Sequence, residues 1–136
     1  HFLGMIPRAE LPALYHDADL FLSASTTEVH PLAMIEALAS GLPVVAVWDE
    51  ALRGMVCDGV NARVAPREIG AFSAALAALL DSPAERAAYG QESRRISREY
   101  SLEKQVERLI SLYREAVRSR VDRRPETGDR RLTTED

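Results

Sequence analysis

The chain has 136 residues, 46% of them hydrophobic and 28% charged, which is enough apolar material for one small folded domain. Its formal net charge of −4 argues against nucleic acid or an anionic membrane as the main partner, because both bind a basic face. The single cysteine cannot form an internal disulfide, and no apolar stretch approaches the roughly 20 residues that span a bilayer, so disulfide-rich secreted proteins and membrane-spanning proteins are excluded.

The first residues, His1-Phe2-Leu3-Gly4, include neither an initiator methionine nor the basic segment of a signal peptide. We therefore expect a fragment of a longer cytoplasmic polypeptide. The run His1–Leu3 predicts a short strand, closed by the glycine that follows. A short helix is expected over Arg8–Asp17, with Leu11 and Tyr15 on its apolar face.

The middle of the chain alternates apolar runs with a helical period. Leu20–Ala24 predicts a buried strand, and Pro31–Ser40 predicts a helix with proline in its first turn and Gly41 as its end. The β-branched run Pro43–Val47 predicts a second strand, and Arg63–Ala65 is a weaker candidate for a third.

The last part of the chain is helical in pattern. One helix is expected from about Arg67, and the run Ser82-Pro83-Ala84-Glu85 matches a capping box that begins another, reaching roughly Tyr100. The final helix carries one apolar stripe from Leu102 to Val117.

Strands that alternate with helices, and that are apolar along their whole length, predict an α/β fold with a parallel sheet covered on both faces. We expect this domain to occupy residues 1–120. Residues 121–136 form a charged tail with few apolar anchors, which we expect to be disordered.

The loop before Pro31 lies outside the carboxyl end of a predicted parallel strand, where open α/β sheets bind ligands. The amides of Leu32 and Ala33 belong to the first turn of the helix and, with the helix dipole, suit a phosphate; Pro31 loses no donor there that the helix needs. Glu36 lies five residues into the helix, about 7 Å along its axis, which is the step from a diphosphate to its ribose. A carboxylate at this point can accept hydrogen bonds from both ribose hydroxyls.

The loop itself contributes Glu28 and His30. A carboxylate beside a phosphate would repel it, so Glu28 suits a neutral hydroxyl of a donor sugar or a cationic centre. Each residue has a structural alternative: Glu28 could cap the following helix, Glu36 could be a solvated helix residue, and His30 could be an N-cap or rim residue instead of a phosphate or sugar contact. No histidine or cysteine has the spacing of a metal site.

Glu28 and Glu36, eight residues apart and followed by the run Ala37–Ala46, closely resemble the paired-glutamate signature of retaining GT-B glycosyltransferases. The similarity extends from about Phe2 to Val117. It is carried by further runs in the same order: Phe2-Leu3-Gly4, Glu10-Leu11-Pro12-Ala13-Leu14-Tyr15, Ala18-Asp19-Leu20, Asp58-Gly59-Val60-Asn61 and Leu112-Tyr113.

The resemblance implies part of a Rossmann-like C-terminal domain that binds a UDP- or GDP-sugar, with no metal or other cofactor. By this resemblance Glu28 is the catalytic-site residue at the donor-sugar hydroxyls, the backbone from His30 through Pro31 and Leu32 to Ala33 meets the sugar and diphosphate, and Glu36 holds the ribose. The full enzyme would transfer a hexose to an acceptor with retention. The family often has an aromatic residue and glycine where this chain has His30-Pro31, a change that bears on the donor sugar.

The resemblance also implies a partner within the same enzyme, an N-terminal domain that binds the acceptor and through which any membrane contact would occur. That domain, and the basic pair that neutralises the diphosphate, are not in this chain, so we expect the chain alone to have little transferase activity. The alternatives are another GT-B enzyme, such as a sugar-nucleotide epimerase, and a non-catalytic module that binds a nucleotide sugar.

Overall fold

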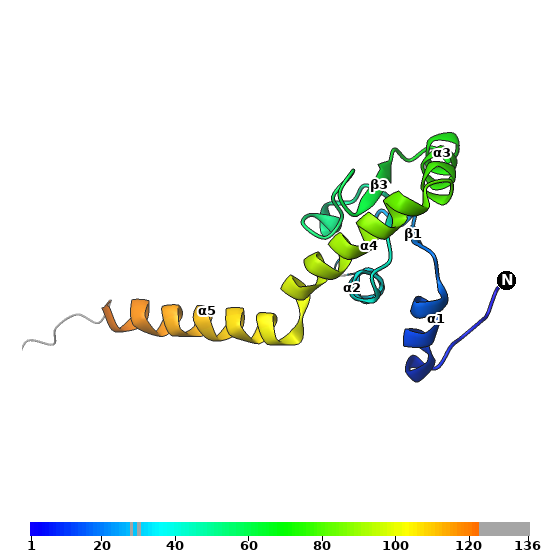
Figure 1. Ribbon diagram of the computed structural model, residues 1–136. Helices are drawn as coiled ribbons and strands as arrows, with labels where there is room; N and C mark the ends of the chain where they lie inside the picture. Colours follow the sequence, from blue (N-terminus) through cyan, green and yellow to red (C-terminus); the bar gives the residue numbers. More distant parts are fainter. Residues whose placement is uncertain (28, 30, 123–136) are drawn as a thin grey trace, which may run out of the picture. The chain divides into compact units, whose positions relative to one another are not determined.

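The computed structural model describes residues 1–27, 29 and 31–122 (Figure 1). The chain divides into two compact units, one over His1–Ser101 and a second that begins at Leu102.

The first unit is built on a parallel sheet of three strands among the described residues: β1 (Phe21–Ser23), β2 (Val44–Val47) and β3 (Ala62–Ala65), in the order β1-β2-β3. Both pairings are parallel, and Val44 at the start of β2 is in register with a residue of each neighbour. All four residues of β2 are buried, as a central strand requires. The predicted α/β class and parallel sheet are confirmed.

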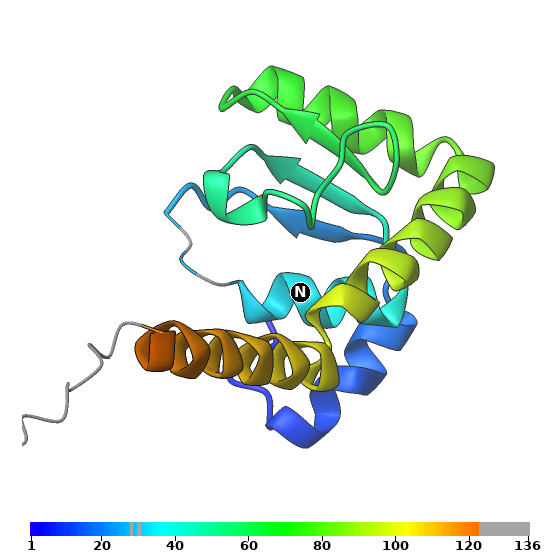
Figure 2. The ribbon, with the colours of Figure 1, turned by 90° about the vertical axis from the view of Figure 1, so that its left-hand side faces the viewer.

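The helices join these strands and cover the sheet. They are α1 (Leu11–Asp17), α2 (Leu32–Ser40), α3 (Ile69–Leu80), α4 (Pro83–Ser97) and α5 (Leu102–Asp122), with single 3-10 turns at η1 (Arg8–Glu10), η2 (Glu50–Leu52) and η3 (Arg98–Tyr100). Figure 2 shows α2 and α3 on opposite faces of the sheet. The α/β unit is therefore covered on both faces at its central strand.

The alternation of side chains along β2 divides the core into two layers. Val44 and Ala46 face a cluster that includes Met34 and Leu38 of α2, whereas Val45 faces Leu79 of α3. Successive side chains of a strand point to opposite faces, so one buried strand anchors both helices.

Helix α4 packs against both α2 and α3, and in Figure 2 it runs from the α3 side of the sheet to the α2 side. Gly41 ends α2 in the left-handed conformation, with φ of 82°, and its amide donates to the Leu38 carbonyl at 3.0 Å. Gly90 of α4 lies so close to this turn that a Cβ would be 2.4 Å from the Gly41 carbonyl oxygen. Two glycines thus allow α4 to cross the end of α2.

Two strand predictions need correction. His1–Leu3 is not a strand: these residues take no part in the sheet of the described residues, and Phe2 is fully exposed. The buried strand predicted over Leu20–Ala24 is shorter, and its Leu22 is 45% exposed. Leu22 is in register with Val45, on the α3 side, but α3 packs against β2 and β3 and leaves β1 uncovered.

The predicted capping box at the start of α4 is also wrong. Ser82 occupies the N-cap position but its side chain makes no cap hydrogen bond. Glu85, the other member of the box, instead forms an ion pair with Arg63 of β3 at 2.7 Å. A charged partner on the neighbouring strand is a stronger attraction for this carboxylate than the N-cap amide.

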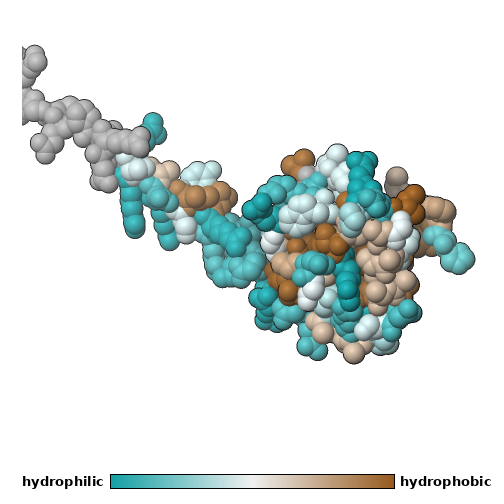
Figure 3. Space-filling model, turned by 90° about the horizontal axis from the view of Figure 1, so that it is seen from above, coloured by the Kyte–Doolittle hydropathy of each residue, from teal (hydrophilic) through white to brown (hydrophobic). Residues whose placement is uncertain are grey.

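The second unit, as far as it is described, is the single helix α5. Its start at Leu102 agrees with the prediction, and the apolar stripe through Val106, Leu109 and Tyr113 is exposed. In Figure 3 the helix that leads to the grey C-terminal atoms carries brown apolar groups among teal polar ones. Helix α5 reaches Asp122, and the rest of the predicted tail lies outside the described residues. No helix in the described ranges is long and apolar enough to cross a membrane.

Candidate functional site

The candidate site begins where β1 ends and α2 starts, at the carboxyl edge of the parallel sheet. Pro31 precedes α2 as its N-cap residue instead of lying in the first turn, so the helix starts one residue later than predicted. The Pro31 carbonyl accepts the first backbone hydrogen bond of the helix, from the Ile35 amide at 3.2 Å. No described side chain caps α2, and Leu32 and Ala33 are both exposed. The amides of Leu32 and Ala33 belong to the first turn of α2, whose backbone donors have no acceptor within the helix and suit an anion.

Glu36 lies in the second turn of α2 and is half-buried. Its Oε2 atom accepts a hydrogen bond from the Tyr15 hydroxyl of α1 at 3.2 Å. The same hydroxyl lies 3.4 Å from the Ala33 carbonyl oxygen. Since a hydroxyl has one hydrogen to donate, the shorter distance and the charge both favour Glu36 as the acceptor.

Tyr15 is itself held by its surroundings. Its ring packs against the ring of Phe21, the first residue of β1, with centroids 6.3 Å apart and planes at 50°. Burial, and then the negative charge of Glu36, raise the pKa of the Tyr15 hydroxyl. The hydroxyl therefore stays protonated at neutral pH and remains a donor to the carboxylate.

A pocket of about 230 Å³ lies between α1 and α2, beside this hydrogen bond. It is lined by Arg8, Leu11, Pro12, Tyr15, Glu36, Ala39 and Ser40. Its walls are mostly apolar, with one cation and one carboxylate as the charged groups among them. This composition suits a flat or partly apolar ligand that also offers hydroxyl groups to the carboxylate.

A second pocket, of about 390 Å³, lies at the carboxyl ends of the three strands on the α3 side. It is lined by Ala24, Val47, Arg67, Glu68, Ile69, Phe72 and Ser73. The sequence pattern assigns Arg67 only to the start of a helix. In the structure Arg67 provides a cation at the edge where α/β sheets bind ligands.

The structure brings together four of the six predicted site residues. Pro31, Leu32 and Ala33 form the start of α2, and Glu36 lies one turn further along the same helix. Glu28 and His30 lie outside the described residues, so their predicted contacts stay predictions.

Sequence reasoning missed Tyr15 and Arg8. Tyr15 was assigned to the apolar face of a short helix, and its hydroxyl was not considered. The signal is that a tyrosine on an apolar helix face needs a hydrogen-bond partner for its hydroxyl where the ring packs against the domain. The sequence offered no way to identify Glu36 as that partner.

The residues after β2 form a compact local structure around η2. Asp49 caps η2 by accepting from the Ala51 amide at 2.8 Å, and Glu50 pairs with Arg53 at 2.6 Å. These carboxylates therefore have local partners. Within the described ranges, no group of three or more histidine, cysteine or acidic residues is arranged to hold a metal ion.

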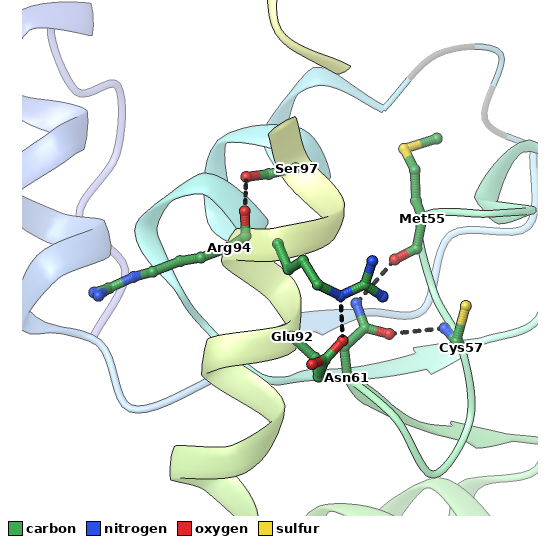
Figure 4. Close-up of polar contacts among 7 residues, drawn as sticks. Met55, Cys57, Asn61, Glu92, Arg94 and Ser97 are labelled. Carbon is green, nitrogen blue, oxygen red and sulfur yellow. Dashed lines mark hydrogen bonds and ion pairs between the residues drawn. The ribbon is translucent and has the colours of Figure 1, made fainter. Parts of the chain in front are cut away.

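The turn that leads into β3 is fixed by a buried asparagine. Figure 4 shows the Asn61 side chain between two backbone groups: Oδ1 accepts from the Cys57 amide at 2.8 Å and Nδ2 donates to the Met55 carbonyl at 2.9 Å. Asn61 thus has a structural role in the turn.

Known proteins resemble this chain over most of the first unit. Residues 1–96 match the family model described as glycosyl transferases group 1. The chain is 44% identical to the alpha-monoglucosyldiacylglycerol synthase of Acholeplasma laidlawii over 59 residues, which are 43% of this chain and 15% of that protein. It is 33% identical to the D-inositol 3-phosphate glycosyltransferase of Kineococcus radiotolerans over 128 residues, which are 88% of this chain and 29% of that protein.

Solved structures agree with this assignment of the fold. The sucrose-phosphate synthase of Thermosynechococcus elongatus superposes with a TM-score of 0.78 and 25% identity, over 86% of this chain and 30% of that one. The pneumococcal O-GlcNAc transferase GtfA, solved with UDP and GlcNAc, superposes with a TM-score of 0.69 at 23% identity, over 79% of this chain and 23% of that one. In each comparison the chain spans less than a third of the known protein.

Proposed function

Because the chain belongs to the glycosyl transferases group 1 family, we propose that it provides the nucleotide part of the donor site of a glycosyltransferase. The donor is a UDP- or GDP-sugar, and the whole protein transfers its hexose to an acceptor with retention of configuration. One observation carries this proposal: Glu36, held by Tyr15, lies one turn inside a helix that starts at the carboxyl edge of the sheet, with Leu32 and Ala33 of its first turn exposed.

The diphosphate binds at the start of α2. The exposed amides of Leu32 and Ala33 donate to its oxygens, and the positive end of the helix dipole attracts its charge. As the bond to the sugar breaks, negative charge grows on the diphosphate, and the same groups stabilise it as a leaving group. The proposal requires no metal or other cofactor.

The ribose binds beside Glu36, whose carboxylate accepts hydrogen bonds from its two hydroxyls. Glu36 lies four residues after Leu32, about 6 Å along the helix axis at roughly 1.5 Å per residue, a separation that suits the ribose and the diphosphate of one nucleotide. The base would lie in the pocket between α1 and α2, where the walls are apolar. Glu28 is proposed to contact hydroxyls of the donor sugar.

The remaining parts of the enzyme lie in the portion that its relatives have and this chain does not. An N-terminal domain of the same protein supplies the acceptor site, and a basic pair upstream in the donor-binding domain neutralises the diphosphate. We also propose that the whole protein is cytoplasmic, as expected from the sequence.

The test is a calorimetric titration of the full-length protein with UDP, GDP and ADP, for the wild type and Glu36→Ala. We expect one nucleotide to bind, and the variant to weaken that binding about tenfold to a hundredfold, since a carboxylate that binds a ligand hydroxyl contributes about 1.5–3 kcal/mol. Glu92→Ala is the matched control, because Glu92 is a helix glutamate in a local ion pair with Arg95.

The outcomes are distinct. No binding of any nucleotide by the wild type, or equal binding by wild type and Glu36→Ala, would refute the proposed donor site. Binding without transfer of sugar to any acceptor would favour the alternative of a non-catalytic module that binds nucleotide sugars.

A further inference from the structure

Three elements of the first unit meet at Tyr15. The residue lies on α1, its ring packs on Phe21 of β1, and its hydroxyl donates to Glu36 of α2. The hydrogen bond links residues 21 positions apart in the sequence, so it depends on the packing of α1 against α2.

The hydrogen bond restrains a side chain that would otherwise be mobile. A glutamate has three rotatable bonds, and fixing such a side chain costs conformational entropy. In this structure Oε2 is held by Tyr15, and no described residue donates to Oε1. The carboxylate is thus oriented by one oxygen while the other is open to a ligand.

From this geometry we propose that Tyr15 is a positioning residue, which orients the Glu36 carboxylate toward the ribose hydroxyls and so increases the selectivity of the site for ribonucleotides. This inference rests on the proposed function, because it assumes that Glu36 binds ribose. The Tyr15 hydroxyl acts through Glu36, whereas the Tyr15 ring lines the pocket proposed for the base.

A purely structural role for Tyr15 has a different consequence. If the hydroxyl only joined α1 to α2, its loss would weaken every nucleotide to the same extent, because the whole helix would shift. If it orients Glu36, its loss weakens only those nucleotides whose ribose hydroxyls the carboxylate contacts. The two roles are therefore separated by removing the hydroxyls from the ligand.

The experiment uses the full-length protein, Tyr15→Phe, Glu36→Ala and the double variant, titrated with UDP and GDP and with their 2′,3′-dideoxy forms. Tyr15→Phe keeps the ring on Phe21 and removes only the hydroxyl, and its melting temperature shows whether the fold is retained. Tyr113→Phe is the control, because Tyr113 is an exposed tyrosine on α5.

We expect Tyr15→Phe to raise the Kd of the preferred ribonucleotide about tenfold, the usual effect of one hydrogen bond to a charged group, and to leave the Kd of its dideoxy form unchanged. In the Glu36→Ala background the same substitution has no further effect, because it acts through that carboxylate.

Equal weakening of the ribose and dideoxy nucleotides, or a full additional loss in the Glu36→Ala background, would overturn this inference while the proposed function stands. A wild type that binds no nucleotide would overturn the proposed function and this inference with it.

Discussion

At the scale of single residues, some buried polar side chains in the first unit lie beside charged groups that are themselves paired across two elements. Tyr89 of α4 is a clear example, because only 7% of it is exposed and its hydroxyl lies by Glu85 in the ion pair with Arg63. Burial first, and then the charge of Glu85, raise the pKa of Tyr89 to about 12. The folded state therefore favours the protonated tyrosine.

This pKa predicts a loss of stability in alkali. An unfolded tyrosine titrates near pH 10, so the contribution of Tyr89 is fully present below pH 10 and is lost as the pH rises from about 10 to about 12. We expect unfolding free energies measured from pH 8 to pH 12 to fall more steeply for the wild type than for Tyr89→Phe, by up to about 2 kcal/mol. Parallel curves for the two proteins would contradict this.

At the scale of elements, the crossing of α4 over the end of α2 depends on a missing side chain. A Cβ at Gly90 would lie 2.4 Å from the Gly41 carbonyl oxygen, and that oxygen belongs to a backbone turn that cannot move away easily. In contrast, a Cβ at Gly70 of α3 would have no neighbour within 4 Å. The two helical glycines therefore provide a matched pair.

We expect Gly90→Ala to destabilise the protein by about 1–3 kcal/mol, as overpacking does, and to lower its melting temperature. Gly70→Ala is expected to be neutral or to stabilise it by up to about 1 kcal/mol, because alanine favours a helix and meets no obstruction. Thermal unfolding of both variants tests this. If Gly90→Ala is as stable as the wild type, the close crossing of α4 and α2 is wrong.

At the scale of the whole molecule, the two units differ in how much they bury. The four residues of β2 are all buried, whereas the large apolar side chains of α5, such as Leu109 and Ile110, are exposed. Local opening is easiest where few apolar contacts are buried, so α5 should open more often than the sheet.

Hydrogen exchange of the whole protein measures this difference directly. We expect peptides from Val44–Val47 to exchange at least about a hundredfold more slowly than peptides from Leu102–Asp122, as expected for a difference of about 3 kcal/mol in local opening. Equal protection of both segments would mean that the rest of the protein covers α5 and buries its apolar stripe.

Much of the fold could be predicted because its signals are local. The helix Arg8–Asp17, the end of α2 at Gly41 and the β-branched strand after it follow from periodicity and turn chemistry over a few residues. The strand at His1–Leu3 was wrong because an apolar run has the composition of a strand whether or not a neighbouring strand exists to pair with it.

In the candidate site, too, the residues placed by local sequence could be predicted and the contacts between distant residues could not. Glu36 could be predicted because its place in a helix after a strand, and its distance from the first turn, are properties of a short stretch of sequence. Tyr15 could not be predicted as its partner, because that hydrogen bond joins residues 21 positions apart.

By itself the sequence determined the alternation of strands and helices, the helix that carries Glu36 and the family to which the chain belongs. Only the tertiary structure decided that the Tyr15 hydroxyl donates to the Glu36 carboxylate, and that Glu85 pairs with Arg63 instead of capping its own helix. The physical reason is that hydrogen bonds within a helix or turn connect residues close in sequence, whereas these contacts exist only once α1, α2, β3 and α4 have packed together.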